Sequence, residues 1–468
     1  MMSARATTLL FGLASARLLG THLSVEAVGL YSLATAVGTF VATGSDVGIR
    51  NVYVRDVAQN LEAGPGLLAA FTIVKAVAAG VLLPLGVFYV ARQATGWEGV
   101  GAGGAIGLGL VVNSVAIAWL SIARAHERFG WDALGQVVFS AAVLGAWVVI
   151  LPLWPSAAAA ATGTLLAAAL QLAFTALVVR HAFRVSLRKL VAGARLRECL
   201  DLIRRSWAYG VGALLVIVYF RVDAVMLEAL RGLHELGIYG AAYKLFEVGV
   251  SAPIAIAAVL LPGYARAVAA GPAAVATTYR ETLRRQCLLA GALGASLIGA
   301  APIVVRLVWT SRFDASAASL IGLGVALTCD AIYSVNGSYL TALDRRRFIV
   351  WNAFAAVVVN VTTNLIAIPR WGAVGASWTT AATEASLLLA STAVMARAAR
   401  TPLWQVAAPV LAIVSLVAAL ALWASLAPGW MVMMIGCGVG LGFGVLTVRA
   451  FLRGEVPQMA PAAELPCA

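Results

Sequence analysis

Long apolar runs separated by short polar segments dominate this chain. Between charged breaks, most runs are close to the ~20 residues that an α-helix needs to cross a membrane. The runs are continuous and do not alternate, unlike the strands of a transmembrane barrel. We therefore expect an all-α polytopic membrane protein. The predicted spans are about fourteen: 6–20, 27–46, 65–91, 99–123, 132–153, 157–179, 206–229, 235–262, 286–308, 316–342, 348–369, 372–396, 403–426 and 429–450.

Composition agrees with this pattern and removes several classes of protein. Hydrophobic residues make up 62% of the 468 residues and charged residues 11%, against roughly 45–50% and 25% in soluble domains. These values exclude a soluble enzyme, a disordered protein and a secreted disulfide scaffold. The five cysteines are scattered without a CxxC motif, so neither a metal site nor a disulfide framework follows from them.

The excess of basic residues predicts the orientation in the membrane. Lys and Arg total 33 and Asp and Glu total 20, a balance that in a soluble protein would point to nucleic acid. Here the charges lie in short loops, and we expect no nucleic-acid partner. With the N-terminus inside, inner loops hold 24 Lys and Arg and outer loops 6, when residues near span ends are counted with the adjoining loop. Cytoplasmic loops carry such an excess, so we expect both termini in the cytoplasm.

The longest connection divides the chain. Residues 181–205 form a basic linker, which we expect to lie as an amphipathic helix on the inner leaflet and to contact anionic lipid. The first span is interrupted by Arg17, and a cleaved signal peptide is the alternative interpretation of this segment. The predicted organisation is an N-terminal lobe, the linker, a C-terminal lobe, two additional spans and a cytoplasmic tail: 1–180, 181–205, 206–396, 397–450 and 451–468.

A short internal repeat supports two related lobes. Residues 28–34 read VGLYSLA and residues 236–242 read LGIYGAA, so that Gly29 and Tyr31 match Gly237 and Tyr239. Both segments begin an outside-to-inside span, six spans apart. An even number of spans per unit gives two units of the same orientation. Two six-span lobes around a central cavity are a transporter architecture.

Several motifs carry a resemblance to a known family. ARLLG at 16–20, GLY at 29–31 and SDVGIRNVYVRDVA at 45–58 are followed by YFRVDAVMLEALRGLHELGIYGAAYKLFE at 219–247 and LLPGYARA at 260–267. In order and spacing this series resembles the oligosaccharide flippases of the polysaccharide transporter family. That family belongs to the multidrug/oligosaccharidyl-lipid/polysaccharide exporter superfamily.

The resemblance implies a function and its partners. Its members are transporters and not enzymes. They move a polyprenyl-diphosphate-linked oligosaccharide from the inner to the outer leaflet of the bacterial inner membrane, by alternating access. The products are cell-surface polysaccharides such as the O-antigen of lipopolysaccharide or exopolysaccharide, and polymerase machinery is an implied partner besides membrane lipids.

Basic residues at membrane depth are an independent signal. Each costs about 2.5–3.5 kcal/mol on insertion scales and so needs a partner, water or a function. Moving a diphosphate through the bilayer requires neutralising its charge in a low dielectric, and arginine pairs bidentately with phosphate. We therefore expect a cationic cavity. Its candidate residues are Arg17, Arg50, Lys75, Arg221 and Lys244.

Acidic residues in the spans are candidates for coupling transport to an ion. Lys244 and Glu247 are three residues apart and share one helix face, so a local ion pair is the alternative to a transport role. We expect no cofactor and no resident metal, with a coupling proton or sodium ion as the one addition left open. The candidate acids are Asp223, Glu247, Asp330 and Glu384.

Two other functions stay open at this stage. A cation-coupled multidrug antiporter of the same superfamily would have an acidic cavity. A membrane-embedded glycan polymerase or ligase would need a large external loop, and the longest predicted outer loop, about ten residues, is too short for a folded site.

Overall fold

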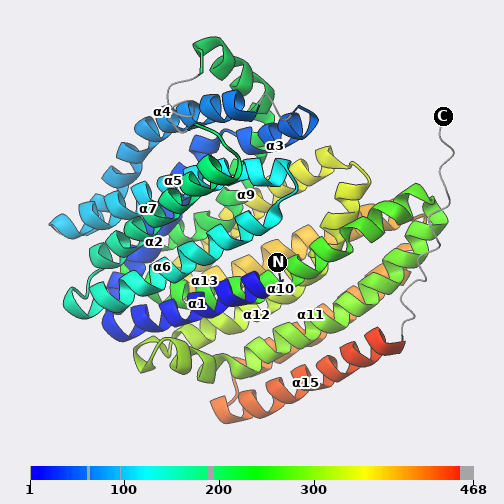
Figure 1. The fold of residues 1–468 in the computed structure, drawn as a ribbon. Helices are drawn as coiled ribbons and strands as arrows, with labels where there is room; N and C mark the ends of the chain where they lie inside the picture. Colours follow the sequence, from blue (N-terminus) through cyan, green and yellow to red (C-terminus); the bar gives the residue numbers. More distant parts are fainter. Residues whose placement is uncertain (1, 61–63, 95, 187–193, 454–468) are drawn as a thin grey trace, which may run out of the picture. The chain divides into compact units, whose positions relative to one another are not determined.

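The computed structural model describes residues 2–60, 64–94, 96–186 and 194–453, and within these ranges the chain is helical without strands (Figure 1). The elements, in chain order, are α1 (Met2–His22), α2 (Val25–Asp46), α3 (Ile49–Gln59), α4 (Gly64–Ala91), α5 (Trp97–Ala125), α6 (Phe129–Leu153), α7 (Ala157–Ala182), α9 (Leu196–Arg231), α10 (Leu233–Ala269), α11 (Pro272–Val308), η2 (Ser311–Phe313), α12 (Ser316–Ala342), α13 (Arg346–Ala398), α14 (Leu403–Ala424) and α15 (Gly429–Arg453).

The predicted fold class is confirmed. In the described ranges, 11 helices are long and apolar enough to cross a membrane: α2, α4 to α7, α9 and α11 to α15. Each of the predicted spans falls on a helix. Helix α13 contains two of them, and α1 and α10, which contain the first and the eighth, are not among the 11. The protein is thus a polytopic helical membrane protein.

The helices group into two compact units by their contacts. Unit 1 comprises Met1–Val248, Ile303–Ser319 and Val350–Thr383, and unit 2 comprises Gly249–Pro302, Leu320–Ile349 and Glu384–Ala468. These units divide helices α10 to α13, whereas the predicted lobes follow the order of the spans. The lobe boundaries stay a prediction.

Small residues allow the helices of unit 1 to approach closely. Helix α5 packs against α2, α4 and α7, and α6 packs against α1 and α7. Helix α7 begins after Ser156, whose hydroxyl accepts a hydrogen bond from the Ala159 amide (3.1 Å). A run of buried alanines, 157–161, follows. Small side chains at helix interfaces are typical of membrane bundles, because close packing stabilises helix association where hydrophobic burial cannot.

The end of α2 positions a short helix that the span pattern does not predict. Val47 and Gly48 adopt left-handed backbone conformations (φ 47° and 73°), which end α2 and redirect the chain into α3. Val52, Tyr53 and Val57 of α3 are buried at helical spacing. The segment is amphipathic but too polar to be recognised as a span.

The predicted linker lies partly outside the described residues, at 187–193. Its last part, from Leu196, is continuous with the seventh predicted span in α9. Cys199 and Leu202 are buried, whereas Leu200 and Arg204 are exposed. This stretch is therefore amphipathic, and its contact with anionic lipid stays a prediction. The cytoplasmic placement of the C-terminal tail also stays a prediction, and residues 454–468 of this tail lie outside the described residues.

A kink in α13 separates its two predicted spans. Gly372 has φ 52° and ψ −131°, conformations outside the helical region. The carboxylate of Glu235 accepts a hydrogen bond from the Ala373 amide (2.7 Å) and so caps the second part of the helix. An added Cβ at Gly372 would lie 2.8 Å from Cδ of Glu235. The break predicted between 369 and 372 is thus a structural feature of unit 1.

Unit 2 has an aromatic and polar core of its own. Tyr264 and Tyr339 stack with ring centroids 4.1 Å apart. Tyr279 donates a hydrogen bond to the Asn336 side chain (2.8 Å), and Asn336 donates to Ser391 (2.9 Å). These bonds satisfy polar groups that would otherwise be costly to bury.

Candidate substrate cavity

Unit 1 contains a cavity of about 300 Å³ lined by α1, α2, α5, α6, α7, α9 and α10, together with Trp309. Its ionisable acidic and basic lining residues come from α9 and α10, namely Arg221, Asp223, Lys244 and Glu247. The other helices contribute aromatic, hydroxyl and aliphatic side chains. The cavity therefore has one charged wall and one neutral wall.

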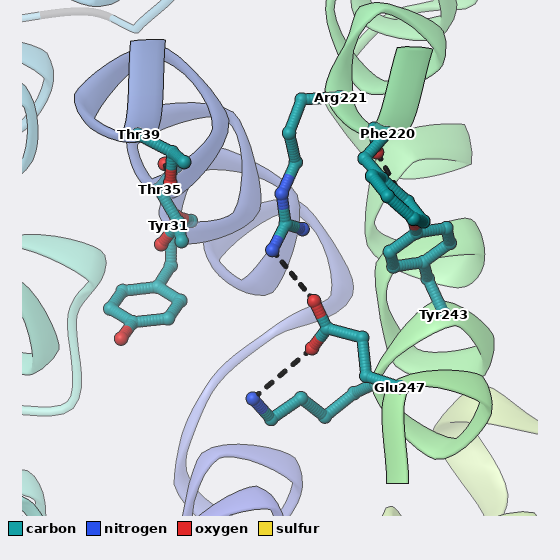
Figure 2. A network of polar contacts seen from close by, with 8 residues as sticks. Tyr31, Thr35, Thr39, Phe220, Arg221, Tyr243 and Glu247 are labelled. Carbon is teal, nitrogen blue, oxygen red and sulfur yellow. Dashed lines mark hydrogen bonds and ion pairs between the residues drawn. The ribbon is translucent and has the colours of Figure 1, made fainter. Parts of the chain in front are cut away.

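Two cations of the charged wall share one carboxylate (Figure 2). Arg221 Nη2 lies 2.6 Å from Glu247 Oε1, and Lys244 Nζ lies 3.4 Å from Glu247 Oε2. The exposed fractions of these side chains are 25% for Arg221, 33% for Glu247 and 48% for Lys244. With all three ionised, the cluster has a net charge of about +1 and an arginine fork within reach of a ligand.

Arg221 packs on Tyr243, which is itself held by a backbone hydrogen bond. The guanidinium lies over the Tyr243 ring, with Cζ 5.5 Å from the ring centroid. Tyr243 in turn donates a hydrogen bond to the Phe220 carbonyl (3.0 Å), as Figure 2 shows. A cation over an aromatic face is stabilised by the ring quadrupole. Arg221 is therefore held on the cavity wall before any cargo binds.

The second acid of the cavity is enclosed by hydrogen bonds. Asp223 is 2% exposed. It accepts a hydrogen bond from the Tyr239 hydroxyl and another from the Ala224 amide (2.8 Å). The Tyr239 oxygen also lies 3.2 Å from the Thr380 hydroxyl. Asp223 is thus a buried, hydrogen-bonded carboxyl at the wall, less accessible than Glu247.

Three of the predicted cationic residues do not line this cavity. Lys75 is fully buried and forms an ion pair with Asp46, and it also donates to the Ala42 carbonyl (3.4 Å). Arg17 donates to the Arg306 carbonyl (3.2 Å). Arg50 is half-buried in α3. In unit 1, the cavity therefore brings together Arg221 and Lys244 of the predicted set.

The two remaining predicted acids lie in unit 2. Asp330 of α12 is 8% exposed, and Glu384 of α13 is 1% exposed. In the described part of the chain, Asp330 Oδ2 has no hydrogen-bond partner. A role for either acid in ion coupling stays a prediction.

The neutral wall of the cavity, which includes Tyr31 and Trp147, was not predicted from the sequence. Tyr31 was visible as part of the repeated GLY motif, but nothing in the sequence shows that its hydroxyl lies 3.3 Å from that of Thr164, or that its ring packs edge-on to Trp147 at 5.6 Å. The repeat could have pointed to it, because Tyr239, its counterpart, also lines the cavity.

Comparison with solved structures shows the fold. The chain is similar to a structure described as the lipid II flippase MurJ in an inward closed conformation, with 13% identity and a TM-score of 0.73 over 97% of this chain and 99% of that one. It is also similar to an inward-facing multidrug resistance MATE family transporter of the MOP superfamily, with 17% identity and a TM-score of 0.64 over 84% and 96%. A MOP superfamily transporter from Pyrococcus furiosus matches with 17% identity and a TM-score of 0.57 over 87% and 94%. The chain thus has a MurJ- and MATE-like polytopic helical fold.

The sequence comparison reaches the family level. No curated protein sequence matches the chain. The sequence profile of the family described as "Polysaccharide biosynthesis protein" matches residues 2–268, more than half of the chain. In agreement with the resemblance indicated by its motifs, the protein therefore belongs to the polysaccharide biosynthesis protein family.

Proposed function

We propose that this protein is a flippase that moves a polyprenyl-diphosphate-linked oligosaccharide from the inner to the outer leaflet of the bacterial plasma membrane, for the synthesis of a cell-surface polysaccharide. The observation that carries the proposal is the Arg221–Glu247–Lys244 cluster on the cavity wall. The family and the fold both point to a transporter of this kind. The lipid II flippase among the similar structures is consistent with a lipid-linked cargo.

The cluster suits a diphosphate better than it suits a cation. A diphosphate can take the place of Glu247 as the partner of both Arg221 and Lys244. Hydrogen bonds between charged groups are about twice as strong as neutral ones, and in a cavity of low dielectric the attraction between opposite charges is strengthened further. The cations are therefore available to an anionic headgroup.

The arrangement disfavours the multidrug antiporter. A cationic drug would need an accessible carboxylate. Glu247 is held by two cations, and Asp223 is buried beneath hydrogen bonds from Tyr239 and the backbone. A drug would have to displace Arg221 and Lys244 and leave both unpaired in the cavity.

Binding of a polyprenyl diphosphate to the purified protein tests this proposal, with the uncharged polyprenol as the reference ligand. Arg221→Gln should weaken diphosphate binding about ten- to hundredfold, because hydrogen bonds to charged groups contribute about 1.5–3 kcal/mol. Arg204→Gln, on an exposed residue of the same helix outside the cavity, is the matched control. Equal binding of polyprenol and diphosphate, or an equal loss in both variants, would contradict the proposal.

The driving ion, the orientation and the partner enzymes are parts of the same proposal. We propose coupling to a proton or sodium gradient, both termini in the cytoplasm, and cooperation with a polysaccharide polymerase. Transport in vesicles with the proton gradient collapsed, or with sodium replaced by potassium, separates the two ions. Transport that survives both conditions would contradict ion coupling.

A further inference from the structure

Helix α2 crosses the first part of α10 beside the cavity, and this part of α10, up to Val248, belongs to unit 1 as α2 does. Val28 and Ser32 of α2 and Leu236 and Gly240 of α10 line the cavity beside this crossing. The contact between the two helices is made by backbone atoms. A Cβ added to Gly29 would lie against the Leu233 carbonyl oxygen and 3.1 Å from the Gly237 amide nitrogen.

The crossing is nearly the same when viewed from either helix. A Cβ added to Gly237 would lie against the Val25 carbonyl oxygen and 2.8 Å from Val25 Cγ1. Val25 and Gly29 of the first repeat unit correspond to Leu233 and Gly237 of the second, at the constant offset of 208 residues that the sequence repeat predicts. The two matching segments therefore meet each other, and each supplies a glycine to the same contact.

A polar side-chain contact lies one turn from the glycine contact, toward the N-terminal ends of both helices. Glu26 Oε1 is 2.7 Å from His234 Nδ1, and these two residues are again 208 apart. Their side chains are 58% and 57% exposed. One turn in the other direction, Ser32 packs against its counterpart Gly240 on the cavity side. The order along the crossing is thus the Glu26–His234 contact, the backbone contact and the cavity.

We propose that this crossing is a seal of the cavity and that the Glu26–His234 pair is a latch that sets how often the seal opens. The proposal depends on the proposed function in one respect: the cargo leaves the cavity past this crossing when α2 and α10 separate. A glycine-to-backbone contact buries little apolar side-chain surface, so its separation loses little hydrophobic stabilisation. An exposed polar contact between two side chains adds a small contribution to the closed form.

Thiol labelling of a Ser32→Cys variant tests the latch without any cargo. A membrane-impermeant thiol reagent is applied from the side of the membrane on which the N-terminal ends of α2 and α10 lie. Labelling of the wild-type protein, which has serine at position 32, gives the background. We expect slow labelling, because the reagent must pass the seal. His234→Ala, or separately Glu26→Gln, should raise the rate about two- to fivefold, the effect of losing or weakening an exposed polar contact. His181→Ala, on an exposed histidine outside the cavity, should leave it unchanged.

Two results would overturn the latch. One is labelling of Ser32→Cys as fast as that of a fully exposed cysteine. The other is an unchanged rate in both His234→Ala and Glu26→Gln.

Cross-linking separates the latch from the proposed function. Glu26→Cys with His234→Cys is joined by a short, reducible bifunctional thiol reagent, and each single cysteine variant is the control. We expect the cross-linked protein to bind polyprenyl diphosphate but not to transport it, and to regain transport on reduction. Transport through the cross-linked protein would overturn the latch. Latch-dependent labelling without any transport of a lipid-linked oligosaccharide would overturn the proposed cargo and leave the latch standing.

Discussion

Replacing Glu247 by glutamine removes the carboxylate that Arg221 and Lys244 share while keeping the shape of the side chain. In the wild-type protein, an anionic headgroup must displace Glu247 before it binds both cations. In Glu247→Gln this competition is reduced, because a neutral amide oxygen is a weaker partner for a guanidinium. We therefore expect Glu247→Gln to bind a polyprenyl diphosphate more tightly than the wild-type protein.

The magnitude follows from the geometry of the cluster. The Arg221–Glu247 contact is short, at 2.6 Å, and both side chains are partly exposed, at 25% and 33%. An exposed ion pair contributes about 0.2–1 kcal/mol, and two charges 4 Å apart near a protein surface interact by about 4 kcal/mol before desolvation is counted. A value of about 1–2 kcal/mol lies between these limits, after discounting for solvent screening. It corresponds to a five- to thirtyfold gain in affinity.

The assay is equilibrium binding of a short-chain polyprenyl diphosphate to purified protein at fixed ionic strength. Glu281→Gln is the matched control, because Glu281 is an exposed acid of α11 outside the cavity. A cationic drug is the second ligand, and its binding should fall or stay absent in Glu247→Gln. Weaker diphosphate binding in Glu247→Gln than in the wild-type protein would refute the reasoning. If the wild-type protein also bound the drug and Glu247→Gln did not, the antiporter would be favoured.

Three further predictions concern stability. Lys75→Met should lower the free energy of unfolding by about 3–5 kcal/mol, because it leaves Asp46, the acidic partner of Lys75, without its cation. Thermal unfolding in detergent measures this change. A loss below about 1 kcal/mol would show that the ion pair is dispensable. Gly372→Ala should lower the free energy of unfolding by about 1–3 kcal/mol, because the backbone there has φ 52° and ψ −131°. Its control is Gly80→Ala, which should be neutral or stabilising because an added Cβ at Gly80 meets nothing within 4 Å. The Arg306 guanidinium holds the pKa of Asp314 below its ordinary value of 3.8. The contribution of this ion pair to the free energy of unfolding is therefore complete above pH 3.8 and is lost as the pH falls through the lowered pKa. Acid unfolding curves of the wild-type protein and Asp314→Asn should therefore converge at low pH and differ at neutral pH, and a constant difference would contradict this.

Hydropathy predicts the helices well because a membrane span must satisfy its backbone polar groups internally. Its limits lie where segments are polar or interrupted. Helix α3 has buried residues at helical spacing but too many charges to be recognised as a span. The kink at Gly372 agrees with the predicted break, yet the capping carboxylate of Glu235 comes from a distant part of the chain.

The site is predictable only where partners are close in sequence. The contact between Lys244 and Glu247 follows from their spacing and is confirmed at 3.4 Å. Arg221 is 26 residues from Glu247, and nothing in the sequence links the two. Lys75 has the same appearance in the sequence as Arg221, a basic residue within an apolar run. Its ion pair with Asp46 distinguishes it, because that contact depends on how α2 packs against α4.

Transport in proteoliposomes tests the central claim most directly. A labelled polyprenyl-diphosphate-linked oligosaccharide is placed in the membrane, and its glycan is detected by a modifying reagent outside the vesicle. We predict that the protein accelerates appearance of the glycan on the opposite face and that Arg221→Gln abolishes this acceleration while Arg204→Gln preserves it. Appearance at the protein-free rate, in vesicles where the same protein moves a cationic drug, would contradict the account.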